Sequence, residues 1–485
     1  MEYILVSIIF GLLNLYSTVS AELSSVLAVA EYALIYGMLL RGRRFPAYAY
    51  FLIFSSVSFE IDAYVYGLDI PFVRYSFYNF PGMTDWMYHI TLFAFFVDVI
   101  WNTRRDYESK IGTKFFHWNR WLLITGTASI LVGMLLNDNG ILTSGIYPKM
   151  AFSTIMRYFF LIIYFYLGYC YAMQEQTRSA MIELIKIILA SVAVVSMIGV
   201  LLGFQGHYSD YDYDKIMLAP MIYAYVPCLM LFFNPRKKES YVYLAIALLA
   251  IVVSFYHPSA VGSKWYLIIA GCIYYAIYNT MSIKSNWLLV FLLILLFTVT
   301  PIVTSMFGTL MDDDDFNSWK FYQAMGVFDI FGYDSLIAWF YSLDDSAQFR
   351  IDEIINITME YIKKPYYALF GKGLAGTTQH YTNFINLDWN ADASFSGLQS
   401  RFGFFYQMHE TSGIIYLRHG VLGLGFIWFI LKELFTKMRS NPCAMFGFMW
   451  FLFYWGWAMS FRLGAVALIL AMTDKEKNQR IVANG

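Results

Sequence analysis

Residues 287–306 read WLLVFLLILLFTVTPIVTSM, a run of twenty residues without a charged side chain. About twenty apolar helical residues cross the roughly 30 Å of hydrocarbon in a bilayer, so this run predicts a transmembrane helix. The last apolar block, 443–473, is too long for one span and short for two, and we interpret it as a tight hairpin. Similar runs lie near 3–19, 24–40, 45–64, 85–101, 121–136, 152–173, 182–204, 219–233, 241–256, 265–280 and 413–431, which brings the predicted total to 13 or 14 spans.

The composition of the 485 residues agrees with this interpretation. Hydrophobic residues make up 59% and charged residues 14%, with a mean hydropathy of +0.53, against about 45–50% and 25% in ordinary globular chains. These values exclude a disordered chain, a collagen, a coiled coil and a cytosolic enzyme. The net charge of −1 gives no reason to expect nucleic acid as a partner. The sequence predicts a polytopic membrane protein.

The distribution of lysine and arginine predicts the orientation of the spans. One set of alternate loops, together with the C-terminal tail, holds 19 Lys and Arg, whereas the short loops of the other set hold four. Basic loops stay in the cytoplasm, so the N-terminus is predicted to be cytoplasmic. Residues 307–412 then form one large loop on the far side, with 14 acidic and six basic residues. It separates the predicted helices of 1–306 from the C-terminal helices and cytoplasmic tail of 413–485.

Three places on the predicted outer face hold residues capable of chemistry. Lys264 lies at the outer mouth of a span, Arg350 opens an amphipathic, helix-like stretch (350–362) that Pro365 ends, and His409 precedes the span 413–431. An arginine at a helix start is mildly disfavoured by the helix dipole, so Arg350 needs another reason to be there. Each has an ordinary structural alternative. Lys264 would be a lysine that extends to the interface, Arg350 would form a surface ion pair, and His409 would be a helix cap or a packed ring.

The order of these pieces is more specific than any one of them. His409, followed ten residues later by Gly420-Val421-Leu422-Gly423, resembles the "His-Asn … Gly-Leu-Leu-Gly" stretch of bacterial O-antigen polymerases and O-antigen ligases. Pro365 with Phe370-Gly371-Lys372-Gly373 resembles that family's "Pro … Gly-x-Gly" turn, and Arg350 stands at the place of its loop arginine. Ser263-Lys264 falls where the family often has Ser-Arg. The resemblance implies an all-α, polytopic transmembrane bundle with one large extracytoplasmic loop, similar to the GT-C glycosyltransferases.

The chain also departs from the family pattern. Glu410 replaces the usual Asn, and Lys264 stands for Arg, which puts that position in doubt because lysine lacks the bidentate fork of a guanidinium. The acidic run Asp312–Asp315 has no counterpart. We interpret it as a solvated acidic turn, with an ion site as the alternative.

The resemblance implies a metal-independent membrane glycosyltransferase that needs no cofactor and acts at the outer face of the bacterial inner membrane. Its donor is an oligosaccharide joined through a pyrophosphate to undecaprenol, and its other partners are the lipid bilayer and, as an open option, a chain-length regulator protein. Arg350 and Lys264 are the candidates for stabilising the departing pyrophosphate. His409 is the candidate base for the acceptor hydroxyl. We therefore expect a polysaccharide polymerase, with a ligase as the runner-up in the same class and a lipid-linked glycan flippase or other transporter as the alternative class.

Two arginines fall inside predicted spans, where a charge costs about 2.5–3.5 kcal/mol on insertion scales. Arg157 and Arg418 each lie a short way in from the outer end of their helices, and either could contact a lipid pyrophosphate. A pairing of either with Glu31, Asp98 or a lipid headgroup is the structural alternative. The sequence leaves both interpretations open.

Overall fold

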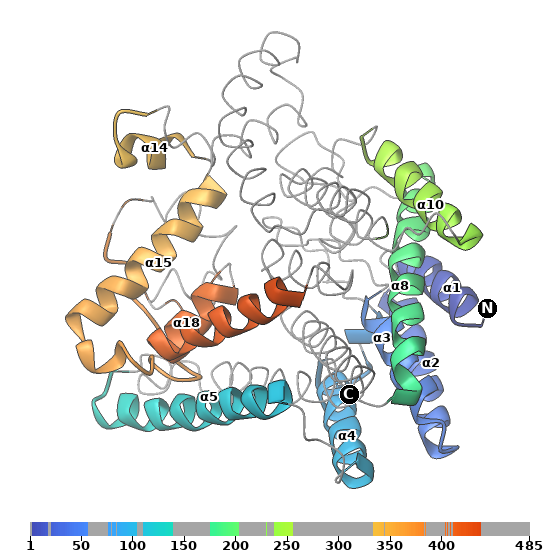
Figure 1. Ribbon diagram of the computed structural model, residues 1–485, viewed down its shortest axis with the longest axis horizontal. Helices are drawn as coiled ribbons and strands as arrows, with labels where there is room; N and C mark the ends of the chain where they lie inside the picture. The colour runs from blue at the N-terminus through green and yellow to red at the C-terminus, as the bar shows by residue number, and fades with distance from the viewer. Residues whose placement is uncertain are drawn as a thin grey trace, which may run out of the picture. The chain divides into compact units, whose positions relative to one another are not determined.

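The computed structural model is helical throughout the part of the chain that it describes (Figure 1). It describes residues 2–17, 21–56, 76–78, 80–83, 85–103, 110–138, 175–202, 229, 237–255, 333–343, 345–382, 384, 403, 405, 408 and 411–437. Within these residues there is no β-strand, and one antiparallel bridge joins Thr378 and Phe405. The prediction of an all-α chain is confirmed for this part.

The helices follow the predicted apolar runs. Eight of the predicted spans overlap with helices, and the others, such as 287–306, lie outside the described residues except for Leu229 in 219–233. The helices are α1 (Glu2–Ser17), α2 (Ala21–Leu40), α3 (Arg44–Ser56), η1 (Ser76–Tyr78), α4 (Asp85–Thr103), α5 (Lys110–Leu135), α8 (Glu175–Leu201), α10 (Lys238–Phe255), α14 (Leu336–Ser342), α15 (Asp345–Lys363), η3 (Pro365–Tyr367) and α18 (Thr411–Lys437).

Three segments of these helices are long and apolar enough to cross a membrane: Glu22–Leu40, Ile182–Gly199 and Ser412–Lys437. The segments Glu2–Asn14 and Arg120–Leu135 are apolar but shorter. The prediction of a membrane protein is therefore confirmed in this general form. The number of crossings and the side on which the N-terminus lies stay predictions.

The chain divides into two compact units. The first comprises Met1–Tyr88 and Ser179–Asp344, and the second comprises His89–Arg178 and Asp345–Gly485. In the first unit an aromatic core joins α2, α3 and η1, with the Tyr32 and Phe77 rings stacked at 4.8 Å and Phe51 in edge contact with Phe77 at 5.5 Å. The predicted domain limits at 306 and 412, which follow the membrane and not this packing, stay predictions.

A buried carboxylate lies inside the first unit. Glu31 on α2 is fully buried, and its Oε1 accepts hydrogen bonds from Asn14 Nδ2 at 2.9 Å and from Ser76 Oγ at 2.8 Å. Uncharged donors thus surround this acid, which the sequence had left open as a partner for Arg157 or Arg418. Burying a carboxyl group without such donors would be strongly unfavourable.

In the second unit, α15 packs against α18 and η3, and α18 packs against α5 (Figure 1). α15 ends at Lys363 because Pro365 cannot continue the helix and restricts the residue before it. The stretch 350–362 was predicted to be helical, and this is confirmed. Its start was predicted wrongly, because α15 begins at Asp345 and Arg350 therefore lies in its second turn. The unfavourable helix-dipole position that had singled out Arg350 does not exist.

Candidate functional site

The helix α15 buries a polar face. Its buried positions follow the spacing of one helical face, and they include Asp352, Glu353, Asn356 and Glu360, which are exposed by 6% or less. Residues four apart on a helix lie above one another, so these side chains form a row. A row of buried acids and amides needs partners that satisfy its hydrogen bonds, and those partners define the site.

The helix α18, against which α15 packs, is interrupted at Gly420. Gly420 has φ 57° and ψ −143°, so the carbonyls before it and the N–H groups after it lose their helical partners. The N–H groups of Val421 and Leu422 donate instead to the carbonyls of Ala368 and Leu369, at 2.9 and 3.1 Å.

The same segment also fills the other side of the interruption. Lys372 N–H donates to the Leu417 carbonyl at 2.9 Å, and Gly373 N–H donates to the Arg418 carbonyl at 3.0 Å. The turn 368–373 therefore supplies two acceptors and two donors in the place of the missing helical bonds. Tyr361 on α15 adds its hydroxyl, which donates to the Leu417 carbonyl at 2.8 Å.

Glycine is required where the two segments touch. Gly371 has φ 72°, and a Cβ there would overlap the backbone of Arg418 and His419. At Gly420, a Cβ would overlap the Ala368 carbonyl oxygen. Backbone atoms cannot move aside as a flexible side chain can. The Gly-Lys-Gly and Gly-Val-Leu-Gly motifs, which the sequence singled out separately, thus form one interlocked structure.

An ion cluster anchors this turn to α15. Glu360 is fully buried and accepts from Lys372 Nζ at 2.7 Å, from Lys364 Nζ at 2.9 Å and from the Tyr381 hydroxyl. Lys364 also pairs with Asp138, which follows α5. Two cations and two carboxylates therefore join α15, the turn and the end of α5.

Electrostatics in the cluster favour the ionised acid. Burial acts to raise the pKa of the Glu360 carboxyl, but the Lys372 ammonium and the hydrogen bonds from three neighbouring side chains outweigh it and hold that pKa below its ordinary value. Burial lowers the pKa of Lys372, and the ion pair with Glu360 opposes that change. Glu360 neutralises the charge of Lys372 within the cluster, so this lysine has a structural role.

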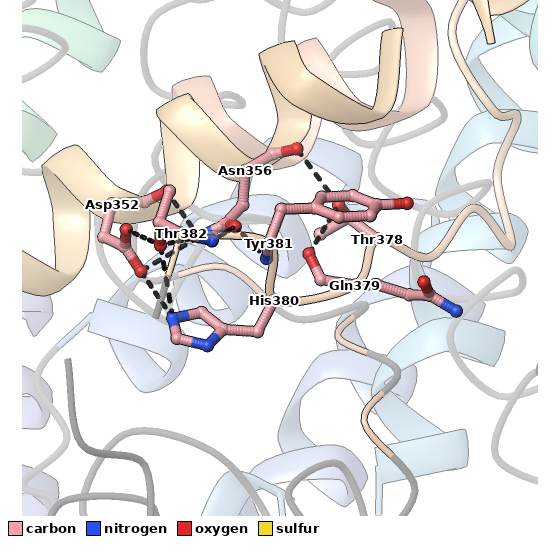
Figure 2. Close-up of polar contacts among 7 residues, drawn as sticks. All are labelled: Asp352, Asn356, Thr378, Gln379, His380, Tyr381 and Thr382. Atoms are coloured by element: carbon pink, nitrogen blue, oxygen red, sulfur yellow. Dashed lines mark hydrogen bonds and ion pairs between the residues drawn. The ribbon is translucent and has the colours of Figure 1, made fainter. Parts of the chain in front are cut away.

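A second network occupies the N-terminal half of the same face, as Figure 2 shows. Asp352 accepts from Thr382 Oγ1 at 2.5 Å, from Asn356 Nδ2 at 2.9 Å and from His380 Nε2 at 2.9 Å. Asn356 Oδ1 in turn accepts from the backbone N–H groups of Tyr381 and Thr382, at 2.5 and 3.1 Å. The segment 380–382 is thereby fixed along α15.

The structure describes two of the five candidate residues chosen from the sequence. Arg350 is half-buried on α15, and Arg418 is buried on α18, two residues before the interruption. His409, Lys264 and Arg157 lie outside the described residues, as do Glu410 and Asp312–Asp315. The described residues include no group of three or more His, Cys, Asp or Glu side chains that could hold a metal ion.

Sequence reasoning did not single out Asp352, Glu360, Lys372 or His380 as functional side chains. The polar residues of α15 repeat with helical spacing, and such a row ordinarily indicates a solvated face. Lys372 carried one signal, its position between two glycines of a motif. His380 carried none, because its partner Asp352 lies 28 positions earlier in the chain.

We compared the whole chain with models of protein families, with curated proteins and with solved structures, and none of them matches it.

Proposed function

We propose that this protein is a membrane glycosyltransferase that polymerises lipid-linked oligosaccharide repeats at the outer face of a bacterial inner membrane. The observation that carries the proposal is the interlocking of the turn 368–373 with α18 at Gly420. Both partners are motifs through which the sequence resembles O-antigen polymerases and ligases. Their direct contact supports the proposal, because it brings the two motifs together in one structure.

In this proposal the donor is an oligosaccharide on undecaprenyl pyrophosphate. Negative charge grows on the pyrophosphate as it leaves, and positioned cations stabilise that charge. Arg350 and Lys264 take this role, with Arg157 and Arg418 as further contacts to the phosphates. His409 contacts the acceptor sugar. The half-buried setting of Arg350 supports this assignment, because a charge shielded from water acts more strongly on a nearby anion.

A ligase that moves finished glycan onto an acceptor lipid or protein is the second candidate, because the same two motifs occur in it. Deletion of the gene separates the candidates. We expect surface glycan reduced to single repeats, as seen on an electrophoretic ladder. Finished polymer that stays on undecaprenol and never reaches its acceptor would indicate the ligase. Repeats that accumulate on the inner leaflet would contradict both enzymes and indicate a flippase.

The cations provide a prediction at residue level. In the deletion strain, Arg350→Ala is expected to abolish polymer, and Lys264→Ala to reduce it strongly, whereas Lys264→Arg is tolerated because a charge at the pyrophosphate is what the site needs. The readout is the glycan ladder at matched protein level. Lys363→Ala is the control, since Lys363 is an exposed cation on the same helix. Normal chain length from Lys264→Glu would remove Lys264 from the site.

A further inference from the structure

We infer that His380, oriented by the Asp352 carboxylate, is a general base that takes the proton from the acceptor sugar hydroxyl. This inference rests on the proposed function and adds to it a catalytic residue on α15's polar face. His409 would then contact the acceptor without taking its proton.

The geometry fixes which ring nitrogen can act. Asp352 is 3% exposed, and its Oδ2 lies 2.9 Å from His380 Nε2. A carboxylate can only accept a hydrogen bond, so the proton of the neutral imidazole lies on Nε2. The other nitrogen, Nδ1, then carries a lone pair. This is the arrangement in which a buried acid orients a histidine and stabilises the cation that forms on it.

The Nδ1 atom is placed to receive a proton. Figure 2 shows it on the side of the ring away from Asp352. In the described part of the chain it has no hydrogen-bond partner, and the His380 side chain is 13% exposed. The ring of Phe405 approaches edge-on, with the two centroids 6.4 Å apart. The imidazole is therefore held by Asp352 and Phe405, while 13% of the side chain remains exposed.

A purely structural role explains less of this arrangement. The backbone of the segment 380–382 is already fixed by Asn356, which accepts from two of its N–H groups, and the Thr382 hydroxyl is bound to Asp352. The imidazole is not needed to hold the segment. Its hydrogen bond to Asp352 places the ring proton on Nε2 and leaves Nδ1 able to accept a proton.

The location of His380 suits an acceptor that arrives from water. Thr378 and Phe405 exchange both backbone hydrogen bonds at 2.8 Å, and a Cβ added to Gly413, in the first turn of α18, would lie 3.2 Å from Met408 Cβ. His380 thus lies near Phe405, which precedes the span Ser412–Lys437 in the chain. A sugar acceptor and a lipid-anchored donor can meet at such an end of a span.

The chemical step balances without a metal or a cofactor. The acceptor oxygen forms a bond with the anomeric carbon of the donor, and the bond from that carbon to the pyrophosphate oxygen breaks. Its electron pair leaves with the undecaprenyl pyrophosphate. The hydroxyl proton moves to His380 Nδ1, and the resulting imidazolium is stabilised by the Asp352 carboxylate before it releases the proton to water.

The test uses the purified full-length protein and lipid-linked oligosaccharide extracted from the deletion strain. His380→Gln keeps an amide donor for Asp352 but has no basic nitrogen. We expect kcat to fall about 10²- to 10⁴-fold, the usual contribution of a positioned base, with little change in thermal unfolding. His117→Gln on α5 is the matched control, because His117 is an exposed histidine. Added imidazole should partly restore the rate of His380→Ala, as a missing base can be replaced by one from solution.

The outcomes separate this inference from the function beneath it. If the wild-type protein makes no polymer from the extract, the proposed function fails and the inference fails with it. If the wild-type protein is active and His380→Gln keeps kcat within twofold, only the inference is overturned. A folded His380→Ala variant that imidazole does not rescue also overturns it. Asp352→Asn is expected to lower kcat with KM nearly unchanged, and a change in KM alone would overturn its positioning role.

Discussion

Glu360→Ala is expected to lower the free energy of unfolding by about 3–5 kcal/mol, the usual effect of removing one partner from a buried ion pair. The variant leaves Lys372, which is 3% exposed, as a buried cation whose partner at 2.7 Å is gone. It also removes the acceptor of the Tyr381 hydroxyl. Thermal unfolding of the purified protein in detergent, together with its yield in the membrane, measures the loss.

A double variant separates the charge from the packing. Glu360→Leu combined with Lys372→Met replaces the pair by apolar side chains of similar volume, and such replacements are often neutral in proteins. We expect the double variant to recover at least half of the lost stability, with Lys364 still held by Asp138. A double variant as unstable as Glu360→Ala would show that the cluster matters for its shape and not for its charge balance.

The sign of the pH dependence follows from the lowered pKa of Glu360. The folded state binds the proton more weakly than the unfolded state, so the contribution of Glu360 is fully present above its unfolded pKa of about 4.3. It is lost as the pH falls through the still lower folded value. The difference in stability between the wild-type protein and Glu360→Ala should therefore shrink in acid and stay constant at neutral pH.

Gly371→Ala is expected to be at least as damaging, because it combines two costs. A positive φ costs a residue with a Cβ about 1–2 kcal/mol, and here the added Cβ would also overlap the backbone of Arg418 and His419. The turn must then leave the interruption in α18, which removes four backbone hydrogen bonds at once. We expect a loss of about 4 kcal/mol or more, in the range that marks a specific structural failure.

Gly403→Ala is the matched control for this variant. Gly403 has φ 66°, close to that of Gly371, but a Cβ there would meet no atom of the described residues within 4 Å. Its replacement therefore carries the backbone cost alone. Unfolding of the two variants under the same conditions isolates the effect of the overlap. Equal losses would mean that the turn and α18 are not interlocked as the geometry indicates.

The fold was predictable where the physics is local. A bilayer demands long apolar runs, so α2 and α18 were visible in the hydropathy of the sequence. Pro365 likewise marked the end of α15 within two residues. The start of α15 was missed, although Asp344, directly before it, is a residue type that favours the N-cap position. This error gave Arg350 a position at a helix end that it does not have.

The site depended on contacts between distant residues, which local patterns do not encode. The polar row on α15 repeats as a solvated face would, and only the packing of α18 and the segment 371–382 shows that it is buried. The two glycine motifs were visible in the sequence, yet nothing in either one indicated that it completes the backbone of the other. Each motif alone therefore indicated the site less strongly than the contact between the two motifs does.

The interruption at Gly420 also bears on how the chain is made. An unwound turn inside a span leaves backbone groups that lipid cannot satisfy, so an isolated α18 would be penalised as it enters the bilayer. The residues that satisfy those groups, 368–373, precede α18 in the chain and have left the ribosome before it. Because synthesis runs from the N-terminus, the turn 368–373 is made before α18. The interrupted helix α18 can therefore form its hydrogen bonds to this turn before any later segment is made.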